Sequence, residues 1–151
     1  MSKGASIAVQ LVLVLVIAGL GYFLYESITN PWEERELIIE QREEVRQRMS
    51  DIRQVLIRHN QVTGRFPSTL DSVKIFAETD SSLLADRDQM FGAGYTFDSL
   101  LLSPLSGERF LYTASDTGRV KYYQLTSPDY PEDVIGADQP EVNRLNVATW
   151  E

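Results

Sequence analysis

The sequence predicts an α+β protein with an N-terminal transmembrane helix, a long amphipathic helix and a small antiparallel β-sheet domain. Three observations lead to this fold class. Residues 5–25 are apolar almost throughout and carry no charge. Residues 31–60 repeat apolar side chains at helical spacing, and residues 109–126 alternate apolar and polar side chains around a turn. The expected divisions are a cytoplasmic N-terminus (1–4), a transmembrane helix (5–25), a connecting helix (26–60), a small α+β domain (61–136) and a C-terminal tail (137–151).

The apolar stretch 5–25 is long enough to cross a bilayer, because about 20 helical residues at about 1.5 Å each span a hydrocarbon core of about 30 Å. Lys3 precedes this stretch and Glu26 follows it, so the basic end should stay in the cytoplasm. We therefore expect a single-pass protein of the inner (cytoplasmic) membrane that contacts lipid through 5–25. Its C-terminal domain would lie outside the cytoplasm.

A cleaved signal peptide is the alternative interpretation of the same stretch, since signal peptides also combine a basic start with an apolar run. The residues at the end of the run, 21–25, are Gly-Tyr-Phe-Leu-Tyr and contain no pattern of small residues that would suit cleavage. An uncleaved anchor is therefore expected.

A second helix is expected after a short connector at 26–30. Asn30 would cap it, Pro31 would occupy its first position and Glu33 would complete a capping box. Gly64 should end it, and Glu44 is spaced to pair with Arg48. The apolar stripe of this helix consists of Ile38, Val45, Met49, Ile52 and Leu56.

Two interpretations of that stripe stay open. In the first, the lower half of the helix lies on its own domain. In the second, the stripe is the seam of a dimeric coiled coil, although Arg35 and Arg42 are poor seam residues. Only the C-terminal half of the helix therefore has a face suited to burial.

The domain should begin with two short helices, one starting at Ser68 and one at Asp80, followed by an extended segment at 95–102. A β-hairpin is predicted next, with strands at 109–115 and 119–126 and a turn at 116–118. One strand would present Phe110, Tyr112 and Ala114 on a single face, and the other Val120 and Tyr122. The long helix would cover this sheet.

The last segment, 127–151, is rich in Pro, Asp, Glu and Asn and shows no lasting periodicity. An ordered loop at 129–136 followed by a frayed end is expected. The apolar side chains of this segment could still dock on the domain; they are Val134, Ile135, Leu145, Val147 and Trp150.

The composition argues against an enzyme, because the chain has no Cys and its one imidazole, His59, lies at the end of a charged helix. The net charge of −8 makes nucleic acid a poor partner. Asp129, Glu132 and Asp133, with Asp138 nearby, could offer oxygen ligands to calcium, although a solvated acidic loop is the simpler interpretation. No other cofactor is expected. The tyrosines of the hairpin suit strands and could alternatively form a stacking surface; they are Tyr112, Tyr122 and Tyr123.

Three stretches resemble type IV pilins and the major pseudopilins of type II secretion. Residues 59–70 (HNQVTGRFPSTL) are similar to the segment after the long pseudopilin helix, and 102–112 (LSPLSGERFLY) to the turn that enters the sheet. Residues 123–129 (YQLTSPD) are similar to the closing strand and to a loop that binds calcium in some members. The resemblance implies a pilin-like domain in an envelope assembly, with protein partners that include further copies of the chain.

The N-terminus departs from the pilin pattern. Pilin precursors are cut after a Gly, which is usually followed by an aromatic residue, and they carry Glu at the fifth mature position. Here Gly4 is followed by Ala5, and the fifth position after Gly4 is Val9. The resemblance therefore implies a pseudopilin-like domain on an uncleaved anchor. The alternatives from other classes are a bitopic coiled-coil scaffold that recruits envelope partners and a sensor domain with calcium as its first ligand to test.

Overall fold

The computed structural model describes the backbone of residues 3–140 and 142–151, and the side chains of these residues except those of 3, 5 and 28–34. The chain forms two compact units, Met1–Glu40 and Gln41–Glu151. Helix α1 runs through both as Lys3–Thr63. The predicted connector at 26–30 is therefore wrong. These five residues include no Gly or Pro to stop a helix. The predicted caps Asn30 and Glu33 fall among the side chains that are not described.

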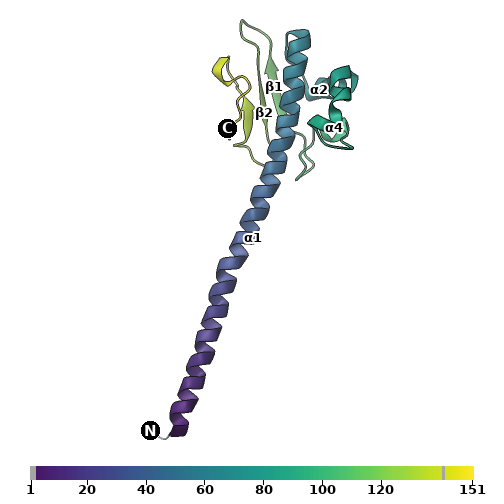
Figure 1. Ribbon diagram of the computed structural model, residues 1–151. Helices are drawn as coiled ribbons and strands as arrows, with labels where there is room; N and C mark the ends of the chain where they lie inside the picture. The colour runs from purple at the N-terminus through teal and green to yellow at the C-terminus, as the bar shows by residue number, and fades with distance from the viewer. Residues whose placement is uncertain (1–2, 141) are drawn as a thin grey trace. The chain divides into compact units, whose positions relative to one another are not determined.

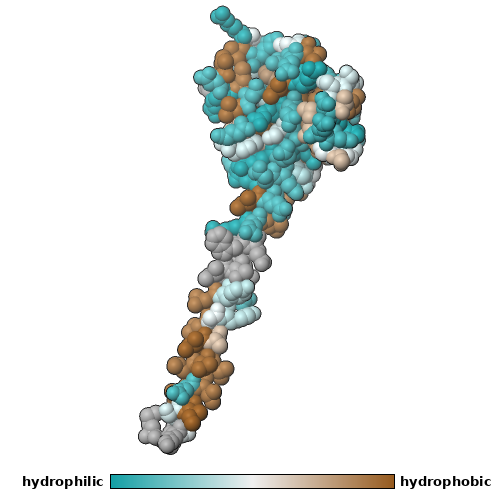
Figure 2. All heavy atoms as spheres, viewed as in Figure 1, coloured by the Kyte–Doolittle hydropathy of each residue, from teal (hydrophilic) through white to brown (hydrophobic). Residues whose placement is uncertain are grey.

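In the first unit, Ser6–Ser27 is long and apolar enough to cross a membrane. Its described side chains are exposed to solvent rather than packed on protein. Figure 2 shows the apolar residues gathered along this part of α1. A signal sequence near an N-terminus would pass the same test of length and composition. The predicted apolar span is confirmed to that extent.

In the second unit, the C-terminal half of α1 lies between a β-sheet and a group of short helices (Figure 1). The sheet is antiparallel with strand order β1-β2-β3. Its strands are β1 (Leu111–Ser115), β2 (Tyr122–Thr126) and β3 (Val134–Gly136). The helices besides α1 are α2 (Leu70–Thr79), α3 (Ser81–Ala85), α4 (Arg87–Met90) and the 3-10 turns η1 (Phe97–Ser99) and η2 (Val142–Arg144).

The stripe on α1 forms the centre of the core. Its fully buried members are Val45, Met49, Ile52 and Leu56, and Val55, outside the predicted stripe, is fully buried beside them. They join one cluster with Phe110, Leu125 and Ile135 from the sheet side. The expectation that the lower half of the helix packs on its own domain is confirmed. Ile38, about two helical turns before Val45, is exposed and lies in the other unit.

The hairpin exists, but its predicted register is wrong. Ser115 pairs with Tyr122, so residues 116–121 form the connection instead of a three-residue turn. A shift of three residues moves every side chain of the second strand to the opposite face. Tyr123 and Leu125 therefore face the core, where they pair with Ala114 and Tyr112. Tyr122, which was predicted to face the core together with Val120, lies on the opposite face of the strand.

Residues 95–102 are not extended as predicted. Phe97, Leu100 and Leu101 are buried, and their spacing of three and four residues is that of a helical turn, which η1 supplies. The short helices begin close to the predicted places. Asp80 caps α3 by accepting hydrogen bonds from two backbone N–H groups. Helix α2 starts at Leu70, with Thr69 as its cap, two residues after the predicted start at Ser68.

The C-terminal segment is part of the domain. Strand β3, inside the loop predicted at 129–136, completes the sheet and was not predicted. Ile135 is fully buried and forms an isolated bridge with Ala148, which is also buried. Trp150 packs against the core, while Val147 stays largely exposed. The compact unit consequently extends to the last residue.

Candidate functional site

The acidic loop between β2 and β3 folds into a tight turn that directs one carboxylate inward. The Ser127 hydroxyl accepts from the backbone N–H of Tyr130 at 3.1 Å, and the N–H of Asp133 donates to the Tyr130 carbonyl at 2.8 Å. The N–H of Ser127 donates to the Asp133 carbonyl at 3.1 Å. This backbone arrangement turns Asp133 toward α1, where it is almost fully buried.

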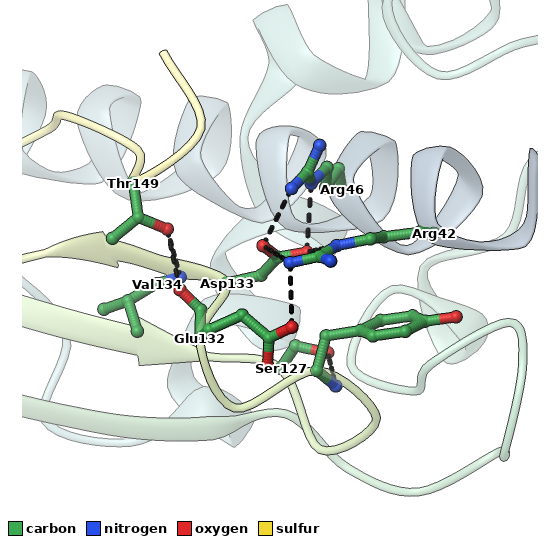
Figure 3. A network of polar contacts seen from close by, with 8 residues as sticks. Arg42, Arg46, Ser127, Glu132, Asp133, Val134 and Thr149 are labelled. Atoms are coloured by element: carbon green, nitrogen blue, oxygen red, sulfur yellow. Dashed lines mark hydrogen bonds and ion pairs between the residues drawn. The ribbon is translucent and has the colours of Figure 1, made fainter. Parts of the chain in front are cut away.

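Two arginines one helical turn apart on α1 bind the Asp133 carboxylate, as Figure 3 shows. Arg42 donates from Nε and Nη2 at 2.8 and 2.6 Å. Arg46 donates from Nε and Nη2 at 2.9 and 3.0 Å. Both guanidinium groups are therefore bidentate, the geometry that gives the strongest charge-assisted hydrogen bonds. We call this set of three residues the arginine latch.

The electrostatics of the arginine latch favour the ionised carboxylate. Burial alone would raise the pKa of Asp133, but the hydrogen bonds from Arg42 and Arg46 outweigh it and lower that pKa to about 2. The same contact with Asp133 raises the pKa of Arg42 against the opposing effect of burial. Glu132 also pairs with Arg42 at 3.0 Å, but its side chain is 62% exposed, so this outer pair contributes little.

The three predicted calcium ligands do not converge. Asp129 accepts a hydrogen bond from the Ser103 hydroxyl, and the largely exposed Glu132 pairs with Arg42. Both oxygens of Asp133 are bound by arginine. Within the described part of the chain, no group of three or more Asp, Glu or His side chains is placed to hold a metal ion. Calcium binding stays a prediction. The cationic partners that this loop does have, Arg42 and Arg46, were not foreseen.

The last residues of the chain are tied to the same helix. Arg53 donates to both Glu151 carboxylate oxygens, at 3.0 and 2.8 Å, and to the Asn146 carbonyl at 3.1 Å. The Arg46 guanidinium lies 5.0 Å from the Trp150 ring centre. Arg42 and Arg46 therefore hold the β2–β3 loop, and Arg53, further along α1, holds the C-terminal residues.

Scans against protein-family models, curated proteins and solved structures found no match. The structure itself must therefore carry the functional argument.

The other side chains considered from the sequence have structural contacts. The His59 ring packs edge-on against the Phe76 ring, with ring centres 4.7 Å apart, and its Nδ1 lies 2.8 Å from the Arg65 carbonyl oxygen. Tyr112 donates its hydroxyl to the Pro67 carbonyl at 2.8 Å, and Tyr123 is fully buried. These two tyrosines belong to the core and are not a surface for stacking ligands. Arg48 donates to the Ser99 carbonyl rather than pairing with Glu44 as predicted.

Proposed function

We propose that this chain is a non-enzymatic, single-pass membrane protein that displays a pilin-like α+β domain outside the cytoplasm, as a structural component of a secretion or pilus-like assembly. The observation that carries the proposal is α1 itself. One helix contains both the apolar segment Ser6–Ser27 and the buried stripe around which the domain is built. Membrane attachment and domain folding then depend on the same element.

The packing of the second unit supports the pilin-like interpretation. Ile52 and Leu56 share a core with Phe110, Tyr123 and Leu125, so the long helix covers an antiparallel sheet as the resemblance implies. The interpretation as a coiled-coil scaffold is less favoured, because the residues that would form its seam are used within the domain. Val45 and Met49 have no exposed surface.

Cysteine labelling tests the topology, and the absence of native Cys makes each introduced thiol unique. The chain carrying Asp116→Cys, in an exposed loop, should react with a membrane-impermeant maleimide in spheroplasts. The matched variant Ser2→Cys should react only after the membrane is permeabilised. The reverse pattern, or full-length protein that stays in solution without detergent, would refute the membrane part of the proposal.

Crosslinking tests assembly. A thiol at the buried Met49 should give no homodimer, whereas the seam of a coiled coil would give efficient capture. A photoreactive group at exposed Leu111, on edge strand β1, should be crosslinked in cells to other pilin-like or secretion-apparatus subunits identified by mass. Met49 homodimers, or Leu111 adducts that contain none of these subunits, would contradict the proposed assembly role.

A further inference from the structure

A pocket of about 370 Å³ lies between α1 and the segment that runs from the end of α4 to Pro104. Its lining combines charged, amide and aromatic side chains: Glu44, Gln47, Arg48, Asp51, Phe91, Tyr95 and Pro104. The volume is at the lower end of the range for small-molecule sites, roughly 300–1,000 Å³. The pocket can therefore hold a small molecule or a single side chain of a partner.

Asp51 is the unusual member of this pocket. It is only 4% exposed. It accepts one hydrogen bond from Gln47 Nε2 at 3.0 Å, and among the described residues it forms no ion pair. The positive charge of Arg48 also favours the ionised form of Asp51, but burial outweighs the combined effect of Arg48 and Gln47. The carboxylate is therefore poorly compensated, in contrast to Asp133 with its two arginines. The domain therefore places a carboxylate in this pocket although the hydrogen bond from Gln47 would need only a neutral acceptor.

Arg48, the cation of this pocket, has its own contacts in the domain. Arg48 donates to the Ser99 carbonyl, and its guanidinium lies 5.2 Å from the Tyr95 ring centre. The Tyr95 hydroxyl is itself buried without a hydrogen-bond partner. A carboxylate and a phenol oxygen in this pocket are thus both available to a hydrogen-bond donor.

The remaining walls suit the rest of such a ligand. Phe91 stacks on Tyr95 with ring centres 5.1 Å apart, and Pro104 adds a further apolar surface. Glu44, Arg48 and Asp51 together give the lining a formal charge of −1. Apolar walls hold an alkyl chain, whereas negative charge and aromatic faces attract its cationic end.

We propose that this pocket binds a primary ammonium group carried on an alkyl chain, with Asp51 as its counterion, Tyr95 as a hydrogen-bond acceptor and Phe91 against the chain. This chemistry occurs in the lysine side chain of a protein partner and in free diamines. The proposal concerns the second unit alone, and it holds whether or not the chain belongs to a pilin-like assembly.

Calorimetric titration of the full-length protein in detergent micelles tests the proposal with two probes. Nα-acetyl-lysine amide represents a partner's side chain and 1,4-diaminobutane a free diamine, and tighter binding of one identifies the source. Asp51→Asn preserves the shape of the side chain and its contact with Gln47. Because a hydrogen bond to a charged group is among the strongest polar contacts, this variant should weaken binding at least about tenfold.

Tyr95→Phe removes only the hydroxyl group and should weaken binding about threefold to tenfold. Asp116→Asn is the matched control, because it removes the same charge from an exposed loop and should leave binding unchanged. Both pocket variants should fold, because neither substitution removes a core contact. Melting curves verify this for each variant. Binding of neither probe, or equal affinity in wild type and Asp51→Asn, would overturn the proposal.

Discussion

The arginine latch gives the sharpest test of how this domain is held together. Replacing Asp133 with Asn retains the size of the side chain but removes the charge shared by Arg42 and Arg46. Since a tenfold change in proton affinity corresponds to roughly 1.4 kcal/mol, a pKa lowered from 3.8 to about 2 represents about 2.5 kcal/mol of stability at neutral pH. Breaking a buried ion pair costs about 3–5 kcal/mol, and the partly exposed arginines place this case at the lower end.

We therefore expect Asp133→Asn to lower the free energy of unfolding by about 3 kcal/mol, which is a decrease in Tm of about 13 °C for a domain of roughly 100 residues. Near-UV circular dichroism of the full chain in detergent measures this transition through the packed aromatic side chains of the domain, such as Tyr123 and Trp150. Glu132→Gln is the matched control, because it removes a solvent-exposed contact with the same Arg42 and should change stability by less than about 1 kcal/mol. Equal losses in both variants, or none in Asp133→Asn, would refute the assignment of the arginine latch.

The pH profile supplies an independent check on the same residue. The folded-state pKa of Asp133 lies below its unfolded value, so its contribution to stability is present above about pH 4 and is lost as the pH falls toward 2. Asp133→Asn should lack this acid-dependent loss. Wild type and variant should consequently approach each other in stability as the solution is acidified, and a constant difference between them would contradict the assignment.

Three further predictions test other parts of the fold. Asp51→Asn should stabilise the domain by up to about 3 kcal/mol above pH 6, because burial raises the pKa of Asp51 to about 6. For the same reason, the stability of the wild-type domain should rise as the pH falls from 6 to 4. Melting curves of both proteins at pH 8 and pH 4 measure the two effects. Gly136→Ala should lower the free energy of unfolding by more than about 2 kcal/mol, because φ is +88° and the new Cβ would lie 2.1 Å from the Tyr123 carbonyl oxygen in β2. Gly107→Ala has a φ of +72° but open space around the new Cβ, so it should lower the free energy of unfolding by about 1 kcal/mol in the same melting assay. Leu13→Arg with Val16→Arg should release the chain from the membrane fraction, since each arginine adds about 2.5–3.5 kcal/mol to insertion.

The parts of the fold that could be predicted from sequence are those with a long, regular pattern. The apolar run 5–25 and the stripe from Val45 to Leu56 both persist over many residues, and burial of the stripe against the sheet follows from its spacing. The break expected at 26–30 failed because the capping residues around Pro31 are start signals only when the preceding chain is not already helical. A helix that already runs up to this turn supplies the hydrogen-bond partners of its backbone.

The hairpin register shows where a local signal is too weak. Asp116, Thr117 and Gly118 form a plausible turn, but the tyrosines at 122 and 123 are both acceptable in a strand and do not specify which one faces inward. The core decides this, because Tyr123 fits between Phe66 and Tyr112, with ring centres 4.7 and 6.2 Å from its own. That choice depends on residues more than ten positions away, which no short window of sequence contains.

The arginine latch was beyond prediction for a related reason. Asp133 and Arg42 are 91 residues apart, and in the sequence each belongs to a run of charges that is normally solvated. The one available signal was negative: Arg42 interrupts the apolar stripe at a position that faces the domain. A cation at such a position needs an acceptor in the domain, but Asp80, Asp86 and Asp88 are as closely spaced as the carboxylates of the acidic loop, so the sequence does not specify the partner.

The two buried aspartates of this domain provide the final contrast. Asp133 is held by two arginines and has a lowered pKa, as expected for a carboxylate that stabilises a fold. Asp51 is equally buried but has one amide partner and a raised pKa, so it opposes folding at neutral pH. Groups that lower stability while lining a pocket are typical of binding sites rather than of packing. The opposite pH dependence expected of the two residues separates the structural carboxylate from the one available to a ligand.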